Sequence, residues 1–422
     1  MLDRVFETPP DGHYFFGYYD KSPLDAACTR LLAQRTAFIN RMPEAGEVIQ
    51  FGLFDFPGGA NFTPLGETTA WNWQQGSMLQ WLGPEFERRI LYNDIRDGHY
   101  RAIVRDLETG VEQMLPMAAY TVTSDGRYAL CVDYERLYWY RPGYNYQGPP
   151  RPEKHKPYDP ADGIWRMSLC DGTLQKVISI ENVMALGRVS SMEGATHYLE
   201  HLMINPANTR FAFLHRWLNV DGGIVARLIT ADLDGGNLFV LNDSGRMSHF
   251  CWRDNETVFG YGGTSTAFNK LRSQKAIAKH VIKPLLPLYH RLFPAGGAVS
   301  RQVTGDCYQL MKDRTRNHER IDRTTLPDDG HPTFRPGTTS TIINDSYPNE
   351  NGDCRLFLFD VDQRELLAET TIASDPAVRA TGYRCDLHPK WSFDGRYVSI
   401  DTISARGRGV SVYAIGQAPS GI

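Results

Sequence analysis

The chain lacks the sequence features that mark many secreted, membrane-spanning and nucleotide-dependent proteins. Its first ten residues contain no basic start followed by an apolar run, so we predict no secretory signal. No stretch approaches the roughly 18 unbroken apolar residues that a membrane-spanning helix needs. The sequence has no P-loop, no Rossmann fingerprint after a strand, no Gly-x-Ser-x-Gly elbow and no His-Glu-x-x-His motif. These absences disfavour nucleotide-dependent enzymes and serine hydrolases.

The chain also lacks a large net charge and closely spaced cysteine pairs. The formal net charge is −4 over 422 residues, which gives no general electrostatic reason to bind nucleic acid or an anionic membrane. The seven cysteines are scattered, odd in number and free of any Cys-x-x-Cys pair. This spacing argues against a disulfide framework or a structural zinc site. We therefore expect a cytoplasmic protein with reduced cysteines and no nucleic-acid partner.

The sequence is rich in aromatic residues, in turn residues and in internal repetition. Aromatic residues make up 12% of the chain, and 38 glycines and 25 prolines are available for turns, a mixture that suits many short strands. The clearest repeat unit runs from Cys385 to Asp401 and continues over 409–415. It reads as a short strand, an Asp-Gly hairpin turn, an alternating strand, a loop and a third alternating strand. Six similar units precede it, starting near residues 18, 75, 120, 201, 249 and 331.

Seven such units predict an all-β fold, a seven-bladed β-propeller that takes up residues 1–422 as a single domain. Each unit resembles a four-stranded blade, and blades stack in a ring because one sheet cannot bury both of its faces alone. Since the last unit ends on a third strand, Arg4–Glu7 is predicted to supply the outermost strand of the last blade. A sandwich or a two-domain β protein is the structural alternative.

An insertion at residues 264–300 interrupts the fifth blade with a different periodicity. Between Lys270 and Phe293, apolar residues recur at helical spacing with basic residues between them, and Pro284 and Pro287 are expected to break the helix. We predict a short helical insertion that packs on the propeller with its lysines in water. Contact of residues 270–293 with a membrane surface, or a lid over one mouth of the channel, is the alternative.

Polar residues stand at the start of the innermost strand in blade after blade, and four of them are histidines. Inner strands line the central channel of a propeller, so these residues are predicted to face one mouth of it: Tyr18, Tyr19, Lys21, Gln75, Tyr120, His201, His249, His331 and His388. Imidazoles can ligate a divalent transition metal or transfer a proton near neutral pH. Asp386 is expected on the same strand face as His388 because strand side chains repeat every two residues. The alternative is structural, with each histidine bonded to a neighbouring turn.

The histidine-led inner strands, with Cys385-Asp-Leu-His-Pro-Lys-Trp-Ser-Phe-Asp-Gly395 in the last blade, resemble the oligogalacturonate lyases. Members of that family are seven-bladed cytoplasmic enzymes that cleave uronic-acid oligosaccharides by β-elimination with bound manganese. The resemblance implies that His249 and His388 are metal ligands and that His201 is the base. Asp386 stands where the family has another histidine and Tyr383 where it has a glutamine, so the ligand set is altered and a distinct substrate is implied.

The resemblance implies a metal-assisted lyase that cleaves a uronic-acid-containing oligosaccharide or polysaccharide, with manganese as the expected ion. Arg216 and Lys21 join His201 as catalytic candidates, because a cation can stabilise the developing enolate charge. The substrate-binding candidates are Tyr18, Tyr19, Gln75, Tyr120, His331 and Arg384, and the metal candidates are His249, Asp386 and His388. A non-catalytic propeller that binds a glycan or a protein is one alternative, and a glycoside hydrolase on the same scaffold is another.

Overall fold

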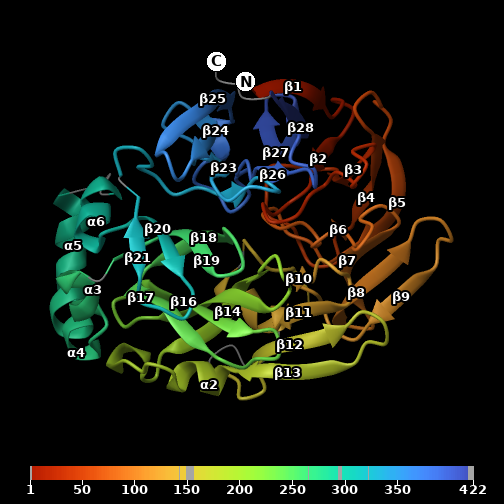
Figure 1. Ribbon diagram of the computed structural model, residues 1–422. Coiled ribbons are helices and arrows are strands. Elements are labelled where there is room, and N and C mark those ends of the chain that lie inside the picture. The colour runs from red at the N-terminus through yellow and green to blue at the C-terminus, as the bar shows by residue number, and fades with distance from the viewer. Residues whose placement is uncertain are drawn as a thin grey trace. The chain divides into compact units, whose positions relative to one another are not determined.

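The computed structural model describes residues 2–141, 143–148, 156–264, 266–292, 297–321 and 323–416. Within these ranges the strands form seven four-stranded sheets (Figure 1). The chain divides into two compact units. The first comprises Met1–Pro150, Met167–Leu174 and Gly330–Ile422, and the second comprises Arg151–Arg166 and Gln175–Asp329. Among the described residues, no helix is long and apolar enough to cross a bilayer.

Four sheets lie wholly in the first unit. Two of them follow chain order: β2(His13–Phe15), β3(Arg30–Thr36), β4(Ile49–Asp55) and β5(Thr63–Thr68), then β6(Gln80–Trp81), β7(Arg89–Arg96), β8(His99–Asp106) and β9(Glu112–Leu115). The third is β22(Thr333–Phe334), β23(Thr341–Asp345), β24(Asp353–Asp360) and β25(Glu365–Ala373). One more sheet does not lie wholly in the first unit. It contains β10(Thr121–Val122), β11(Tyr128–Val132), β12(Gly163–Ser168) and β13(Leu174–Ser179), with α1(Tyr134–Tyr140) after β11.

The fourth sheet of the first unit joins the two ends of the described chain. Its order is β1(Leu2–Glu7), β28(Gly407–Ile415), β27(Tyr397–Ser404) and β26(Lys390–Trp391). β1 pairs antiparallel with β28, from Leu2 opposite Ile415 to Glu7 opposite Ser411. Buried Phe6 anchors β1 because its ring packs edge-on against Phe54, at 5.7 Å between centroids. The prediction that the N-terminal segment supplies the outermost strand of the last blade is confirmed.

The second unit holds two complete sheets and most of the helices. The sheets are β14(Thr196–Ile204), β15(Arg210–Leu218), β16(Ile224–Asp232) and β17(Phe239–Gly245), then β18(Met247–Trp252), β19(Thr257–Gly262), β20(Cys307–Lys312) and β21(His318–Arg320). α2(Ile180–Ala185) precedes β14. Between β19 and β20 lie α3(Ala267–Arg272), α4(Lys275–Ile277), a π-helical turn (Ala278–Ile282), α5(Lys283–Leu292) and α6(Gly297–Thr304), drawn in teal in Figure 1. The expected break at Pro287 is wrong, because this residue lies inside α5.

The repeated Asp-Gly turns form through the same contacts in two sheets. Asp125 accepts hydrogen bonds from the Thr123 hydroxyl and the Arg127 amide, at 2.6 and 3.0 Å. Asp394 accepts the corresponding bonds from the Ser392 hydroxyl and the Arg396 amide, at 2.7 and 3.0 Å. The glycine that follows each aspartate has φ near +68°, a left-handed conformation that glycine adopts without steric cost. The Ser/Thr-x-Asp-Gly-Arg pattern therefore places a hairpin turn in both sheets.

Candidate metal centre

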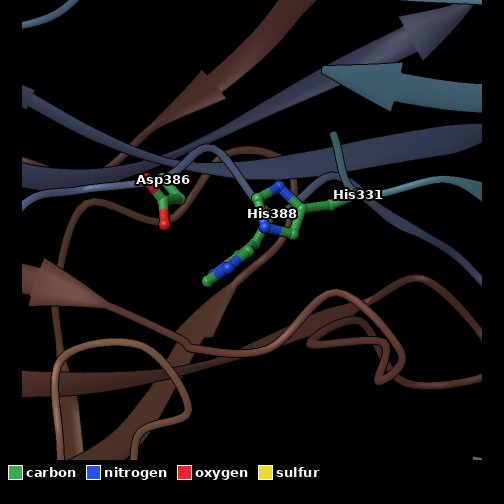
Figure 2. A group of neighbouring side chains, drawn as sticks. All are labelled: His331, Asp386 and His388. Carbon is green, nitrogen blue, oxygen red and sulfur yellow. The ribbon is translucent and has the colours of Figure 1, made fainter. Parts of the chain in front are cut away.

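Two imidazoles and one carboxylate converge in the first unit (Figure 2). One ligand atom from each of His331, Asp386 and His388 lies within 4.8 Å of the other two, and all three side chains are buried. His331 lies two residues before β22, and His388 two residues before β26, so neighbouring sheets contribute to the cluster. The two rings are nearly perpendicular, at 87°, with 4.3 Å between their centroids. Two nitrogens and a carboxylate oxygen form a donor set suited to a divalent transition metal.

Asp345, at the end of β23, fixes the orientation of His331. Its two carboxylate oxygens lie 2.9 and 3.0 Å from Nδ1 of His331, and one of them accepts the His331 amide at 2.7 Å. A carboxylate can only accept here, so Nδ1 carries the proton and Nε2 presents a lone pair. Metal-binding histidines commonly donate the N–H of the ring nitrogen that does not bind the metal to a carboxylate in this way. The same carboxylate accepts the His388 amide at 3.2 Å and so ties both histidine segments together.

The backbone at His388 turns out of the strand conformation. Its φ is +45°, in the left-handed region that costs about 1–3 kcal/mol for a residue other than glycine. Met78, with φ +56°, occupies the equivalent position in the second sheet. In both cases the carbonyl before this residue accepts an amide from the next strand, Ser77 from Asn93 and Leu387 from Asp401. Asp386 and His388 therefore converge through a kinked loop, and the expectation that strand alternation would place them on one face is wrong.

In the first unit, a polar side chain near the end of a sheet's second strand repeatedly accepts hydrogen bonds from backbone amides in the first loop of the next sheet. Gln34 accepts the Ser77 amide at 2.9 Å, Asn93 the Ala119 amide at 2.9 Å, Asp345 the His388 amide at 3.2 Å, and Asp401 the Phe16 and Gly17 amides at 3.0 and 2.9 Å. The sequence analysis missed these four residues. Their signal was a polar residue near the end of each apolar second strand. Asp345 is thus a repeated structural residue that also contacts the candidate metal ligand His331.

An arginine neutralises the carboxylate of the cluster. Arg384 contacts Asp386 through Nε at 3.1 Å and a terminal nitrogen at 3.0 Å, and it donates to the Tyr144 hydroxyl at 3.1 Å. Burial opposes the charge on Arg384, yet Tyr144, Asp386 and Tyr347 together raise its pKa above the ordinary value. A divalent cation at this cluster would therefore share the Asp386 carboxylate with a guanidinium.

The predicted substrate-binding residues fall into two groups in the first unit. Tyr18 and Tyr19 flank the cluster: Tyr18 packs edge-on against His388, with 5.3 Å between centroids, and Tyr19 lies 5.4 Å from His331. Gln75 donates to the hydroxyl of Tyr120 at 2.9 Å, and both are buried. The catalytic candidate Lys21 is buried in an ion pair with Asp20, at 2.8 Å.

The second unit holds the other three predicted site residues. His201 and His249 are neighbours, with 5.8 Å between their rings. Nδ1 of His249 faces Asp329 at 3.3 Å, which resembles the arrangement of His331 and Asp345. Arg216 forms an ion pair with Glu200 at 2.5 Å. The predicted metal ligands are thus divided, with His388 and Asp386 beside His331 in the first unit and His249 beside His201 in the second.

Comparison with known proteins places the fold. No protein-family model and no curated protein sequence matches the chain. Among solved structures, an oligogalacturonate lyase in complex with manganese is similar, with a TM-score of 0.60 and 14% identity over 99% of this chain and 96% of that one. The oligogalacturonate lyase of Vibrio parahaemolyticus has a TM-score of 0.57 and 11% identity, over 99% and 94% of the two chains. A hydrazine synthase of Kuenenia stuttgartiensis has a TM-score of 0.51 and 11% identity, over 95% and 96%.

These likenesses establish architecture, because identities this low show the fold alone. The seven four-stranded sheets and the near-complete coverage agree with the predicted blade count. The structural resemblance to oligogalacturonate lyase spans the chain, while the hydrazine synthase shows that other activities occur on a similar scaffold. The chain is a seven-bladed β-propeller that resembles the oligogalacturonate lyases in structure.

Proposed function

We propose that this protein is a metal-assisted lyase that cleaves a uronic-acid-containing oligosaccharide or polysaccharide by β-elimination. The observation that carries the proposal is the buried cluster of His331, Asp386 and His388, whose ligand atoms lie within 4.8 Å of one another. The fold likeness to an oligogalacturonate lyase in complex with manganese supports it. The proposed substrate is acidic and the proposed ion is Mn²⁺.

The three residues suit a divalent ion in chemistry and in surroundings. Asp345 leaves Nε2 as the ligand nitrogen of His331, and Asp386 supplies a carboxylate oxygen. Mixed imidazole and carboxylate ligands suit manganese, iron and zinc better than they suit calcium. When bound, the cation would neutralise the uronate carboxylate and so make the adjacent C5–H bond more acidic.

The elimination needs a base, a stabilised anion and a protonated leaving group. The base takes the C5 proton, the C–H electrons form the C4–C5 double bond, and the C4–O bond breaks as the leaving oxygen gains a proton. We keep His201 as the proposed base, since a neutral imidazole accepts a proton near neutral pH. Arg216 and Lys21 stay proposals as charge stabilisers, and each would have to exchange its present carboxylate partner, Glu200 or Asp20, for the substrate.

The aromatic and polar side chains named above supply the proposed substrate contacts. Tyr18 and Tyr19 lie against the histidine rings and are buried, so stacking of a sugar on either ring would require neighbouring side chains to move. Arg384 could form a bidentate pair with a substrate carboxylate, since its guanidinium already binds one in Asp386. Gln75 and Tyr120 are proposed to donate or accept hydrogen bonds with sugar hydroxyls.

The test combines metal content with product formation. Protein purified without chelator is expected to hold about one divalent ion per chain and to release unsaturated, ultraviolet-absorbing ends from uronic-acid glycans. His388→Ala should lose both properties, and His201→Ala should lose product formation while keeping the metal. His99→Ala, at an exposed position of β8, is the control. Full activity in either site variant would reject the corresponding role.

A non-catalytic glycan-binding propeller is the second candidate, and the Asp386–Arg384 ion pair favours it. A carboxylate already neutralised by a guanidinium at 3.0 Å needs no cation for its stability. In that case the purified protein would hold no stoichiometric metal, would bind acidic glycans unchanged, and would lose that binding in Arg384→Gln.

A further inference from the structure

Four aliphatic side chains form an exposed stripe on the helical insertion of the second unit. α4, the π-helical turn and α5 follow one another without a gap from Lys275 to Leu292. Along them Val281, Leu285, Leu288 and Leu292 are 51%, 56%, 54% and 62% exposed. Their spacing of four, three and four residues places them on one face of a helix. Side chains of this size are seldom left in water as a continuous row.

The first part of the helical run packs on the second unit, through Ala278 and α3. Ala278 is fully buried, and Ile282, Leu286 and Tyr289 line a pocket together with Phe268 of α3 and with Leu285 of the stripe. The stripe therefore lies beside a partly open apolar pocket and adds to the exposed apolar surface of these helices.

Two polar contacts fix the insertion further. Arg272 forms an ion pair with Asp221 at 2.8 Å, and Lys275 donates to the Glu193 carbonyl at 2.7 Å. Both contacts connect the start of the helical run to the body of the unit. The exposed stripe thus lies on a helical run whose start is held in place by these two contacts.

The insertion also carries charge of a single sign. Residues 267–304 contain seven lysines and arginines and no acidic residue. The whole chain has a net charge of −4, so taking away these seven positive charges leaves −11 on the other residues. Lys279, Lys283 and Arg291 are exposed on the helices that carry the stripe. A segment with net positive charge thus carries this row of exposed aliphatic side chains, although the chain as a whole is acidic.

We propose that this surface, the stripe together with the net positive charge of residues 267–304, binds an anionic lipid bilayer. The aliphatic side chains would enter the boundary between headgroups and acyl chains, while the positive charge of the segment would be attracted to the anionic headgroups. The acidic remainder of the chain would be repelled by the same membrane, which restricts the contact to this surface. The inference does not depend on the proposed lyase activity.

Two other occupants fit the surface less well. A second copy of this chain would bring two segments with seven positive charges each against one another. An acidic protein partner would normally be held by aromatic and arginine anchors at the centre of an interface, whereas the stripe contains only valine and leucine. A bilayer accepts a convex row of aliphatic side chains without any matching shape.

The test uses the full chain with phosphatidylglycerol–phosphatidylcholine vesicles and with pure phosphatidylcholine vesicles, in a co-sedimentation assay. We expect binding to the anionic vesicles that weakens as salt rises, and little binding to the neutral ones. The double variant Leu285→Asp/Leu288→Asp should lose at least about tenfold in vesicle partitioning. Neutralising Lys279, Lys283 and Arg291 to glutamine should weaken binding to anionic vesicles by about tenfold.

The matched control is Leu366→Asp/Leu367→Asp on β25, where the side chains are 45% and 47% exposed. It should bind vesicles as the unaltered protein does, and all variants should keep the same melting temperature within a few degrees. Absence of binding to anionic vesicles overturns the proposal, as does unchanged binding of the leucine variant. A concentration-dependent dimer that this variant abolishes would also overturn it, because the stripe would then bind a second copy.

Discussion

Replacing Asp345 with asparagine tests the candidate metal centre without changing any of its three proposed ligands. Asp345 is buried and receives the Nδ1 proton of His331 and the amides of His331 and His388. Asparagine keeps the shape but presents an NH₂ group on one side. When that group faces Nδ1, the histidine must accept, and its proton moves to Nε2, the nitrogen proposed to bind the metal. The variant therefore favours the wrong tautomer while leaving every ligand in place.

The expected effect on metal binding follows from the loss of this supporting carboxylate. Partners of this kind are worth about 10- to 100-fold in metal affinity, which corresponds to roughly 1.4–2.7 kcal/mol. An effect on folding of similar size should accompany it, because hydrogen bonds to a charged group contribute about 1.5–3 kcal/mol and asparagine keeps one acceptor. Isothermal titration with Mn²⁺ and urea unfolding measure the two effects separately.

Asp25→Asn is the matched control for this experiment. Asp25 is a fully buried carboxylate of the same unit that accepts the amides of Thr29 and Arg30 at 2.7 and 3.1 Å. This variant should lose stability on a similar scale and keep its Mn²⁺ affinity. A folded Asp345→Asn protein that binds Mn²⁺ as tightly as the unaltered chain would refute the role assigned to the carboxylate. Equal loss of affinity in both variants would refute it as well.

Three further substitutions probe charge elsewhere in the two units. Burial is the largest cause that holds the pKa of His215 well below its ordinary 6.5. Below about pH 6.5 the unfolded chain therefore binds more protons than the folded chain. The unfolding free energy should decrease as the pH is lowered through this range, by up to about 1.4 kcal/mol per pH unit. His215→Gln should remove this part of the slope in urea unfolding, and an unchanged slope would contradict the assignment. Lys390→Met removes the buried cation 3.3 Å from Asp401 and should destabilise the protein by about 3–5 kcal/mol; adding Asp401→Asn should recover part of the loss, whereas simple additivity would show that the pair is not coupled. Arg384→Gln should raise Mn²⁺ affinity about tenfold by freeing Asp386 from a guanidinium at 3.0 Å, and unchanged affinity would place the ion elsewhere.

The repeat was visible in the sequence because it depends on local chemistry. The Asp-Gly turns at Gly126 and Gly395 need only the hydroxyl and carboxylate two or three residues away, so they could be recognised from neighbouring residues. The closing contact of β1 with β28 followed from counting strands. Bends that depend on distant partners were not visible: the strand expected to begin at Tyr18 lies instead at His13–Phe15, and His388 sits in a left-handed kink.

The same distinction between local and distant contacts applies to the candidate site. The sequence by itself determined that histidines recur at comparable places in successive blades, and it named Asp386 and His388 as metal candidates, with His249 as the third and His331 as a substrate-binding residue. Only the tertiary structure decided that these three converge and that Asp345 orients one imidazole while Arg384 neutralises the carboxylate. The reason is physical: residues close together in the chain set turns and strand periodicity, whereas the grouping of a metal-binding set depends on how loops from separate sheets pack against one another.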